Sequence, residues 1–316
     1  MNDKLNVIIC GVIKNSGNFL KNSIHLCEKL GRECNKYKIL IYENNSTDST
    51  KDILRTYENN EHFTIIMEDI DNTIIKENSK IWAYTEITGS DHPCRIEQIS
   101  NARNKLIDEI NKDIYDDYNL VVMIDLDTNL FDNKGILHSL NIVKESPKKV
   151  LYGNSFNYYD YYALRSSHSI FSLLGPEING EFFWKNKFNN NIFLSLDYKS
   201  DNLFSVYSAF NGIGVFHKNI FKNRTYDCLV NDSIKKIYNK IFIDHPKLYN
   251  TFKNIIENDC PKFINGNKDN ISNIYWKNNS GYNKPVICEH VSFNFSLIND
   301  GYEIYINPKM LYWKGD

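Results

Sequence analysis

The sequence has no long apolar run, no closely spaced cysteine pair and almost no net charge. No apolar stretch approaches the roughly 18 residues that a membrane-spanning helix needs, and the first one, from Leu5, ends at Lys14. We therefore expect neither a signal peptide nor a transmembrane segment. The formal net charge of -2 gives no general attraction to nucleic acid or to an anionic membrane. Any phosphate-binding site must be local.

The seven cysteines include no Cys-x-x-Cys pair, and their odd number leaves one without a partner. This pattern suits reduced thiols better than a disulfide framework, so we expect a cytoplasmic protein, in the host cytoplasm if the source is a virus. No internal repeat or long linker divides the chain. Its 316 residues, 42% of them hydrophobic, can bury a full core without disulfide bonds.

The first half alternates apolar runs of strand length with segments of helical spacing. Strands are expected at 5–13, 37–43, 63–67, 119–124 and 150–154, and helices at 19–30, 49–58 and 96–112. This alternation predicts an α/β fold with a mostly parallel sheet and helices on both faces. Ligands of such folds bind beyond the carboxyl ends of the strands, so polar residues that follow strands are the ones to inspect.

The second half is rich in aromatic residues and less regular. Short strands are expected at 193–196, 205–210 and 286–295, and loops at 186–191 and 265–279. We interpret it as a part that packs on the first half within the same globular domain.

The strongest chemical signal is the pair Asp125 and Asp127, which follows the apolar strand 121–124. Two carboxylates there would repel a diphosphate, because like charges about 4 Å apart cost on the order of 4 kcal/mol at an effective dielectric near 20. A bridging Mn²⁺ or Mg²⁺ reverses the sign, since it takes carboxylate and phosphate oxygens together. The structural alternative is a turn or a helix cap, where Asp-x-Asp is also common.

Two further motifs precede this pair. Glu43 and a turn at 44–50 follow the second strand, and Arg103 lies in the segment Ala102-Arg103-Asn104 on the helix that leads into the acidic strand. In order and spacing the three motifs resemble the GT-A superfamily of nucleotide-sugar-dependent glycosyltransferases over about 120 residues. For Arg103, the alternative is an ion pair on a surface helix.

The resemblance implies a Rossmann-like GT-A fold that moves a hexose from a GDP- or UDP-sugar to a hydroxyl of a glycan or glycoconjugate. The metal ligands would be Asp125, Asp127 and a late histidine, His290, with Mn²⁺ or Mg²⁺ as the cofactor. The residues that it places at the donor are Cys10, Gly11, Val12, Glu43, Asn45, Asp48, Arg103, Asp125 and Leu126. Arg103 would approach the diphosphate or brace the acidic pair.

Two motifs of the second half extend the resemblance. The segment 158–165, Tyr-Tyr-Asp-Tyr-Tyr-Ala-Leu-Arg, is similar to an element of the capsule-associated α-mannosyltransferases and related large-virus enzymes. The segment 210–214 contains glycines that let the backbone approach a sugar closely, although a β-bulge is the structural alternative. The residues implied at the acceptor are Tyr159, Arg165, Asn211 and Gly212.

Asp160 is the first candidate for the catalytic base, since it lies in the matched motif. Its structural alternative is a hydrogen bond that fixes Arg165. Glu181 and Asp232 are weaker candidates. The aromatic residues at 158–162 and 182–184 could stack on sugar rings or pack in the core.

The resemblance divides the domain into a nucleotide-sugar-binding half, residues 1–154, and an acceptor-binding half, residues 155–316. Two other functions stay open at this point. A sugar-1-phosphate nucleotidyltransferase also binds nucleotide and metal, but the segment 11–18 is a poor version of its glycine-rich basic loop. A non-catalytic glycan-binding domain of the same fold is the second alternative.

Overall fold

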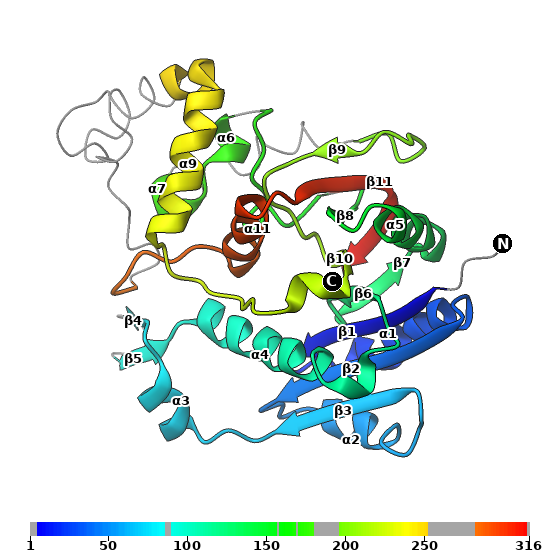
Figure 1. Ribbon diagram of the computed structural model, residues 1–316. Coiled ribbons are helices and arrows are strands. Elements are labelled where there is room, and N and C mark those ends of the chain that lie inside the picture. Colours follow the sequence, from blue (N-terminus) through cyan, green and yellow to red (C-terminus); the bar gives the residue numbers. More distant parts are fainter. Residues whose placement is uncertain are drawn as a thin grey trace.

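The computed structural model describes residues 5–85, 90–156, 158–168, 170–179, 196–251 and 282–314. Its main feature is a nine-stranded sheet with helices packed against it (Figure 1). The strand order is β3-β2-β1-β6-β10-β8-β11-β7, and β9 pairs with β11. Two further strands, β4 and β5, form a small separate sheet.

The strands of the main sheet are β1 (Asn6–Ile13), β2 (Lys36–Asn44), β3 (Phe63–Glu68), β6 (Leu120–Ile124), β7 (Thr128–Phe131), β8 (Lys149–Asn154), β9 (Phe204–Ser205), β10 (Ile213–His217) and β11 (Glu303–Lys314). The small sheet consists of β4 (Trp82–Thr85) and β5 (Ser90–Pro93). The helices are α1 (Gly17–Arg32), α2 (Thr50–Arg55), α3 (Asn72–Asn78), α4 (Arg95–Ile110), α5 (Asn133–Glu145), α6 (Ile170–Leu173), α7 (Pro176–Asn179), α9 (Asp232–Asp244) and α11 (Glu289–Asn299). Short 3₁₀ turns lie at η1 (Asp113–Tyr115) and η3 (Lys218–Phe221).

Six strands of the main sheet share one direction. β3, β2, β1 and β6 pair in parallel, and β8 and β11 are parallel to each other. β10 lies between β6 and β8 and is antiparallel to both, which gives β8 the direction of β6. Only β7, β9 and β10 run the other way within the described residues. The expected α/β fold with a mostly parallel sheet is confirmed.

Each face of the sheet is covered by its own core. In β1, Ile8 and Cys10 enter the core under α4 and α11, whereas Val7 and Ile9 enter the core under α1 and α5. This division follows from the alternation of side chains along a strand, and it explains why the strand is apolar throughout. The expected strands and helices of residues 5–124 are all present, although α2 ends at Arg55 rather than near residue 58.

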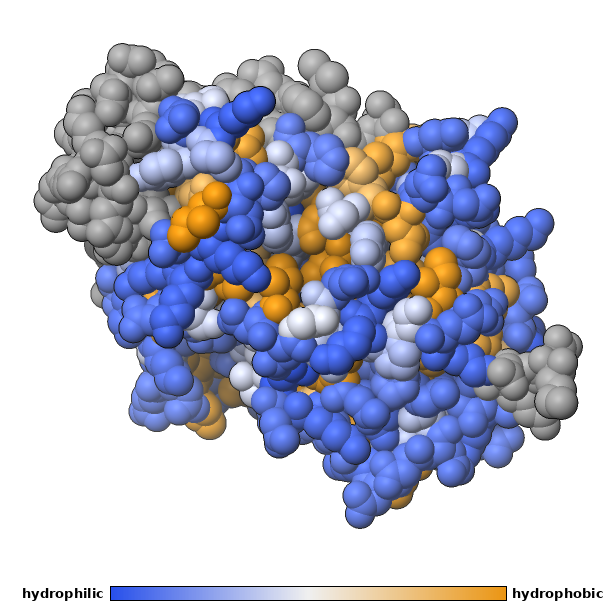
Figure 2. All heavy atoms as spheres, turned by 45° about the horizontal axis from the view of Figure 1, so that its top comes forward, coloured by the Kyte–Doolittle hydropathy of each residue, from blue (hydrophilic) through white to orange (hydrophobic). Residues whose placement is uncertain are grey.

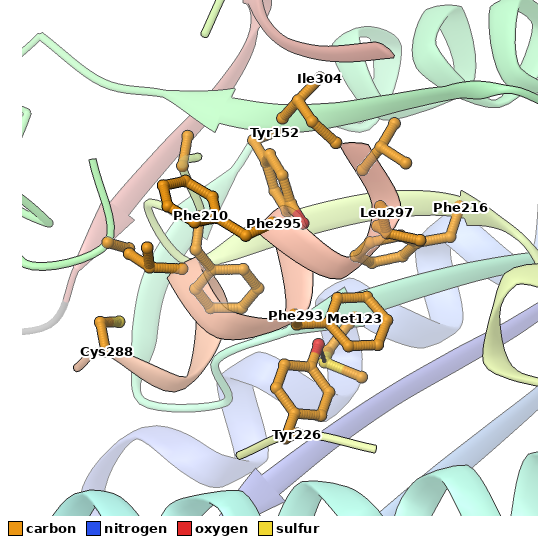
Figure 3. Close-up of a cluster of buried hydrophobic side chains, with 14 of the residues drawn as sticks. Met123, Tyr152, Phe210, Phe216, Tyr226, Cys288, Phe293, Phe295, Leu297 and Ile304 are labelled. Carbon is orange, nitrogen blue, oxygen red and sulfur yellow. Dashed lines mark hydrogen bonds between the residues drawn. The ribbon is translucent and has the colours of Figure 1, made fainter. Parts of the chain in front are cut away.

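The strand expected at 286–295 is wrong, because most of this segment is the start of α11. The helix is buried on nearly all sides and contributes Phe293, Phe295 and Leu297 to the aromatic core shown in Figure 3. A helix without a polar face shows no helical periodicity, so its sequence resembles a buried strand. Consequently Glu289 and His290 are neighbours in one helical turn.

The strand expected at 205–210 is largely wrong as well. Only Phe204 and Ser205 pair with β11, and Ser208 forms an isolated bridge with Arg165. The backbone N–H groups of Tyr207 and Ser208 both donate to the Arg165 carbonyl, which turns the chain away from the sheet. The expected loops at 186–191 and 265–279, the strand at 193–196 apart from its last residue, Glu181 and the aromatic segment 182–184 lie outside the described residues.

The sequence analysis did not anticipate β7 and α5. The Asp132 side chain caps α5 by accepting from the N–H groups of Lys134 and Gly135. One sheet contains strands from both sides of the boundary proposed at 154. Within the described ranges, no helix combines the length and hydrophobicity needed to cross a bilayer.

Candidate functional site

A cleft of about 700 Å³ opens beyond the carboxyl ends of β1 and β6. Its walls come from the loop after β1, from α4, from the turn that follows β6, from the segment 159–162 and from the beginning of α11. Its charged lining residues are Lys14, Arg95, Arg103, Asp125, Asp127, Asp160, Glu289 and Lys314. Hydrophobic residues also gather in the middle of the otherwise hydrophilic face shown in Figure 2.

The acidic pair lies where β6 enters this cleft. The Asp125 N–H donates to the Gly212 carbonyl at 2.9 Å, which fixes the exit of the chain from β6. The Asp127 carboxylate, 40% exposed, has Oδ1 3.5 Å from the Tyr312 hydroxyl and Oδ2 4.0 Å from Lys314 Nζ. Desolvation raises the pKa of Asp125 to about 7; Arg103 opposes this rise, and Asp127 and Asp160 add to it. Bringing a cation to this pair would therefore favour its ionised form.

Arg103 lies between two carboxylates in the wall of the cleft. Its Nη2 is 3.3 Å from Asp125 Oδ1, and its Nε is 3.4 Å from Glu289 Oε1. The guanidinium carbon lies 4.8 Å from the ring centroid of Phe210, so a flat aromatic face supports it. This buried position differs from the surface ion pair of the alternative interpretation. In this geometry Arg103 braces Asp125, and its contact with a diphosphate stays a prediction.

His290 is buried beside Arg103, and its ring stacks on Phe210 with centroids 3.8 Å apart. Burial and the positive charge of Arg103 hold the pKa of His290 well below its ordinary value, so the imidazole is neutral. Neither ring nitrogen has a hydrogen-bond partner among the described residues. His290 lines the same cleft as the acidic pair.

The donor atoms of Asp125 and Asp127 suit a hard divalent cation, which prefers carboxylate oxygens. Among the described residues, however, no three His, Cys, Asp or Glu side chains are close enough together to hold a metal ion. His290 is therefore not assembled with the two carboxylates into a ready-made site. Two protein carboxylates fit the cation as a pair, and the metal role of His290 stays a prediction.

The predicted base and ribose ligands after β2 are engaged within the protein. Glu43 is fully buried, and its Oε1 accepts from the Ser46 N–H at 2.7 Å. Asn45 has a positive φ of 57° and bonds both backbone groups of Ile70. The other oxygen of this carboxylate, Oε2, has no hydrogen-bond partner among the described residues, and the contact of Glu43 with the donor stays a prediction.

Asp48 joins this turn to the next helix. Its Oδ2 accepts from the Gly17 N–H at 2.9 Å, and its Oδ1 accepts from the Thr50 N–H at 3.0 Å. The Ser46 hydroxyl similarly accepts from the N–H of Asn15. The turn thus holds the loop between β1 and α1 in place. Its contact with a nucleotide stays a prediction for Asn45 and Asp48, whose side chains already have these partners.

The three residues predicted at the end of β1 differ in their roles. Cys10 is buried, which raises the pKa of its thiol to about 12. Gly11 allows a close approach, because a Cβ there would lie 2.4 Å from the Ile124 carbonyl oxygen and 2.8 Å from the Leu126 side chain. Only Val12 of the three lines the cleft, as does Leu126 between the two aspartates.

Asp160 and Tyr159 line the cleft on the side of the second half. Asp160 accepts from the backbone N–H groups of Ala163 and Asn211, both at 3.2 Å, and it does not bond Arg165 as the structural alternative assumed. Desolvation raises its pKa. Asn211 and Gly212 have φ of 51° and 83° and turn the chain into β10, so this glycine segment is a left-handed turn and not a bulge.

The side chain of Arg165 is fully buried, and its acceptor contact stays a prediction. Its Nη2 lies 2.8 and 3.0 Å from the two oxygens of Glu177, and its Nε donates to the Tyr238 hydroxyl at 2.8 Å. The Nη1 group donates to the carbonyls of Tyr162 and Leu164. Arg165 thus connects the motif at 158–165 with Glu177 of α7 and Tyr238 of α9.

Several cleft residues escaped the sequence analysis. Lys314 lines the cleft, and the hydroxyl of the buried Tyr312 approaches Asp127. Both come from β11, where nothing but their position in the fold links them to the acidic pair. Lys14 and Arg95 are exposed cations without a motif. The helical assignment of α11 would have indicated Glu289, which then shares one turn with His290.

A second hollow of about 480 Å³ adjoins the cleft between α3 and α4. The two share the lining residues Asn44, Ile75, Gln98 and Ala102. Apolar side chains, among them Ile70 and Ile74, line the second hollow together with amide and carboxylate groups.

A cleft with an acidic pair at the end of a mostly parallel sheet is the arrangement that the sequence analysis expected of a GT-A fold. The model of the family described as Cryptococcal mannosyltransferase 1 matches residues 7–258, and the chain belongs to this family. The match covers the acidic pair, α4 and Asp160, and it ends before α11 and β11. No curated protein matches the sequence.

Solved glycosyltransferase structures show weak similarity to the chain. TarS 1-349 from S. aureus has 9% identity and a TM-score of 0.44, over 98% of this chain and 60% of that one. PcManGT from Pyrobaculum calidifontis, a mannosyltransferase in complex with GDP-Man and Mn²⁺, has 10% identity and a TM-score of 0.42, over 72% and 48%. GalNAc-T7 with UDP, GalNAc and Mn²⁺ has 10% identity and a TM-score of 0.48, over 100% and 45%. The chain thus spans only about half of these proteins, and such scores support no inference about function.

Proposed function

We propose that the protein transfers a hexose from a nucleoside-diphosphate sugar to a hydroxyl of a glycan or glycoconjugate, with the help of a divalent cation. The observation that carries the proposal is the partly buried acidic pair at the end of β6, inside a cleft that is also lined by four cationic side chains. The family to which the chain belongs favours mannose as the sugar.

Asp125 and Asp127 would hold Mn²⁺ or Mg²⁺ together with the diphosphate oxygens. Bound there, the cation would neutralise the diphosphate and stabilise it as a leaving group. Arg103 keeps Asp125 in place, since its guanidinium bridges Asp125 and Glu289. Lys14, Arg95 and Lys314 are then available to attract and orient the phosphates.

The donor base would lie toward the second hollow between α3 and α4. The two hollows are continuous through Asn44 and Gln98, whose amides can donate to and accept from a base. This arrangement supports a nucleotide that extends from the acidic pair along α4.

Asp160 is our candidate for the group that accepts the proton of the attacking hydroxyl. It lies in the cleft, and two backbone N–H groups hold its carboxylate in position. Desolvation raises its pKa, which makes the carboxylate a stronger base. The segment 159–162 would then present Asp160 and Tyr159 to the acceptor.

The proposal is tested by incubating the purified protein with GDP-mannose, UDP-glucose and UDP-N-acetylglucosamine in the presence of Mn²⁺. We expect release of the nucleoside diphosphate, fastest from GDP-mannose. EDTA should abolish the release and added Mn²⁺ should restore it. Asp127→Asn should lower the rate by about two orders of magnitude or more, because the loss of one metal ligand removes several kcal/mol of charge stabilisation.

Asp244→Asn, an exposed aspartate on α9, is the matched control and should retain the wild-type rate. Both variants should melt at the wild-type temperature, since neither carboxylate is buried. Full activity of Asp127→Asn, or indifference to EDTA, would contradict the metal role. Consumption of a nucleoside triphosphate with a sugar phosphate would instead point to a nucleotidyltransferase, and binding without turnover would point to a non-catalytic domain.

A further inference from the structure

Three aromatic side chains gather on the surface next to the cleft. Phe156 and Tyr198 are 57% and 43% exposed, and their ring centroids lie 5.4 Å apart. The Phe156 ring also lies 5.7 Å from Trp313 of β11. We name this cluster of Phe156, Tyr198 and Trp313 the aromatic platform.

The platform is a concentration of exposed apolar surface. Six large hydrophobic side chains are exposed among the described residues, and three of them, Leu130, Phe156 and Tyr198, lie at this place. Leu130 lies beside the platform because β7 pairs Leu130 with Trp313. The other three lie singly on α3, η1 and α9. Scattered exposed hydrophobic residues need no explanation, whereas a cluster indicates a binding surface.

Each side chain of the platform stands on an anchored segment. Phe156 follows Ser155, whose hydroxyl accepts from Asn211 Nδ2 at 3.2 Å. Tyr198 lies in a turn that the Asp197 carboxylate closes by accepting from the Lys199 N–H at 3.0 Å. The Trp313 carbonyl accepts from the Thr128 hydroxyl at 2.8 Å. The platform is therefore formed before any ligand arrives, so little ordering is required on binding.

The platform adjoins the proposed active site through neighbouring residues of two segments. Trp313 lies between Tyr312, whose hydroxyl approaches Asp127, and Lys314, which lines the cleft. Phe156 lies three residues before Tyr159, which also lines the cleft and packs on Tyr312. Because successive side chains of a strand point to opposite sides, Trp313 faces away from Tyr312. A ligand that touches both the platform and the acidic pair must be extended and must pass around the end of β11.

We propose that the aromatic platform binds sugar rings of an extended glycan acceptor whose reacting end lies in the cleft. The proposal rests on the proposed function. A pyranose ring presents a C–H face that packs on an aromatic face, while its hydroxyl groups stay in water at the rim. Lys199 Nζ lies 5.6 Å from the Tyr198 ring centroid, whereas the three rings themselves are uncharged and offer apolar faces that suit a sugar ring better than a phosphate. Its three rings are also too few for a protein interface, which needs about 800 Å² on each partner.

Binding is measured without a donor, by affinity electrophoresis in gels that contain mannan and by titration with manno-oligosaccharides of increasing length. We expect affinity to rise with oligosaccharide length in the wild type. Phe156→Ala should weaken the binding of the long oligosaccharides about fivefold and leave the weak binding of mannose unchanged. Phe156→Tyr should retain the affinity, and Ile243→Ala, an equally exposed position on α9, should behave as the wild type.

Kinetics then separate this proposal from the proposed function. In Phe156→Ala we expect a higher KM for the long acceptor, with an unchanged rate of donor hydrolysis by water. Loss of donor hydrolysis in this variant, or an unchanged affinity for long oligosaccharides, would overturn the platform. Wild-type protein that cleaves no donor would overturn the proposed function, while the binding series would still decide the platform. Sedimentation that shows a dimer dissociated by Phe156→Ala would assign the surface to self-association and also overturn the proposal.

Discussion

Two buried arginines of this protein, Arg103 and Arg165, occupy opposite kinds of surroundings. Arg165 has two hydrogen bonds to Glu177, one to the Tyr238 hydroxyl and two to backbone carbonyls, all between 2.7 and 3.0 Å. Arg103 has longer contacts of 3.3 and 3.4 Å to two carboxylates, and its Nε lacks a hydrogen-bond partner among the described residues. The guanidinium of Arg165 uses all its N–H donors in short hydrogen bonds. The guanidinium of Arg103 lines a cleft and has a donor that is not used.

The difference shows which arginine can serve a ligand. A saturated, fully enclosed ion pair holds the structure together, since either partner alone would be a buried charge. An arginine with long contacts at the edge of a cleft can exchange one partner for another at little cost. Sequence motifs single out both residues, but only the surroundings separate them.

The largest effect is expected from Arg165→Met. This change leaves Glu177 buried without its partner, so we expect the free energy of unfolding to fall by about 3–5 kcal/mol, measured by urea denaturation. The double variant Arg165→Met/Glu177→Leu should regain much of the loss, because no isolated charge remains. A single variant with wild-type stability would erase the distinction between the two arginines.

A smaller effect, mainly on activity, is expected from Arg103→Met. Asp125 would lose its brace, so we expect kcat/KM for the nucleotide sugar to fall about ten- to a hundredfold, or about 1.4–2.7 kcal/mol. The loss of stability should be clearly below that of Arg165→Met. Arg103→Lys should recover part of the activity, since a charge without the planar fork meets only one of the two carboxylates well. Equal destabilisation by both Met variants would show that Arg103 is structural too.

Much of the fold could be predicted from the sequence, because its strands and helices have recognisable local hydrophobic patterns. The strands β1, β2, β3 and β6 and the helices α1, α2 and α4 are apolar runs and amphipathic segments bounded by turn residues. Such patterns depend little on distant parts of the chain. The acidic pair could be located because it follows such a strand. The helix α11 was missed, since burial on all sides removes the periodicity that identifies a helix.

The candidate site could be predicted less completely from the sequence, because its contacts join residues that are far apart in the sequence. Whether an arginine is saturated depends on residues such as Glu177 and Tyr238, which no local pattern connects with Arg165. The turn at 44–50 shows a second difficulty. Its polar residues suit a nucleotide and a helix cap equally well, and in the structure Asp48 bonds the first residue of α1.

The smallest effect concerns pH and comes from His290 beside Arg103. The pKa of His290 is well below its ordinary value in the folded protein, whereas the unfolded chain binds a proton below about pH 6.5. Above that pH the imidazole is neutral in both states, so its protonation does not change the free energy of unfolding. Below that pH, His290 is protonated in the unfolded state but not in the folded state. The free energy of unfolding should therefore fall by up to about 1.4 kcal/mol per pH unit.

His290→Phe, which can keep the stack on Phe210, should lack this contribution, as urea titrations at pH 7.5 and 5.5 would reveal. Arg103→Met should weaken it, because the positive charge of Arg103 is one of the two causes of the lowered pKa. If the histidine variant kept the acid sensitivity of the wild type, other groups would have to be responsible.

The last strand, β11, has a consequence for how the molecule is made. It inserts between β8 and β7, whose sequences leave the ribosome more than a hundred residues earlier. Until it arrives, β8 has a bare edge, and Tyr312 and Lys314 are missing from the neighbourhood of Asp127. Closing so long a loop is slow, so the sheet keeps a gap between β8 and β7 until β11 has been synthesised.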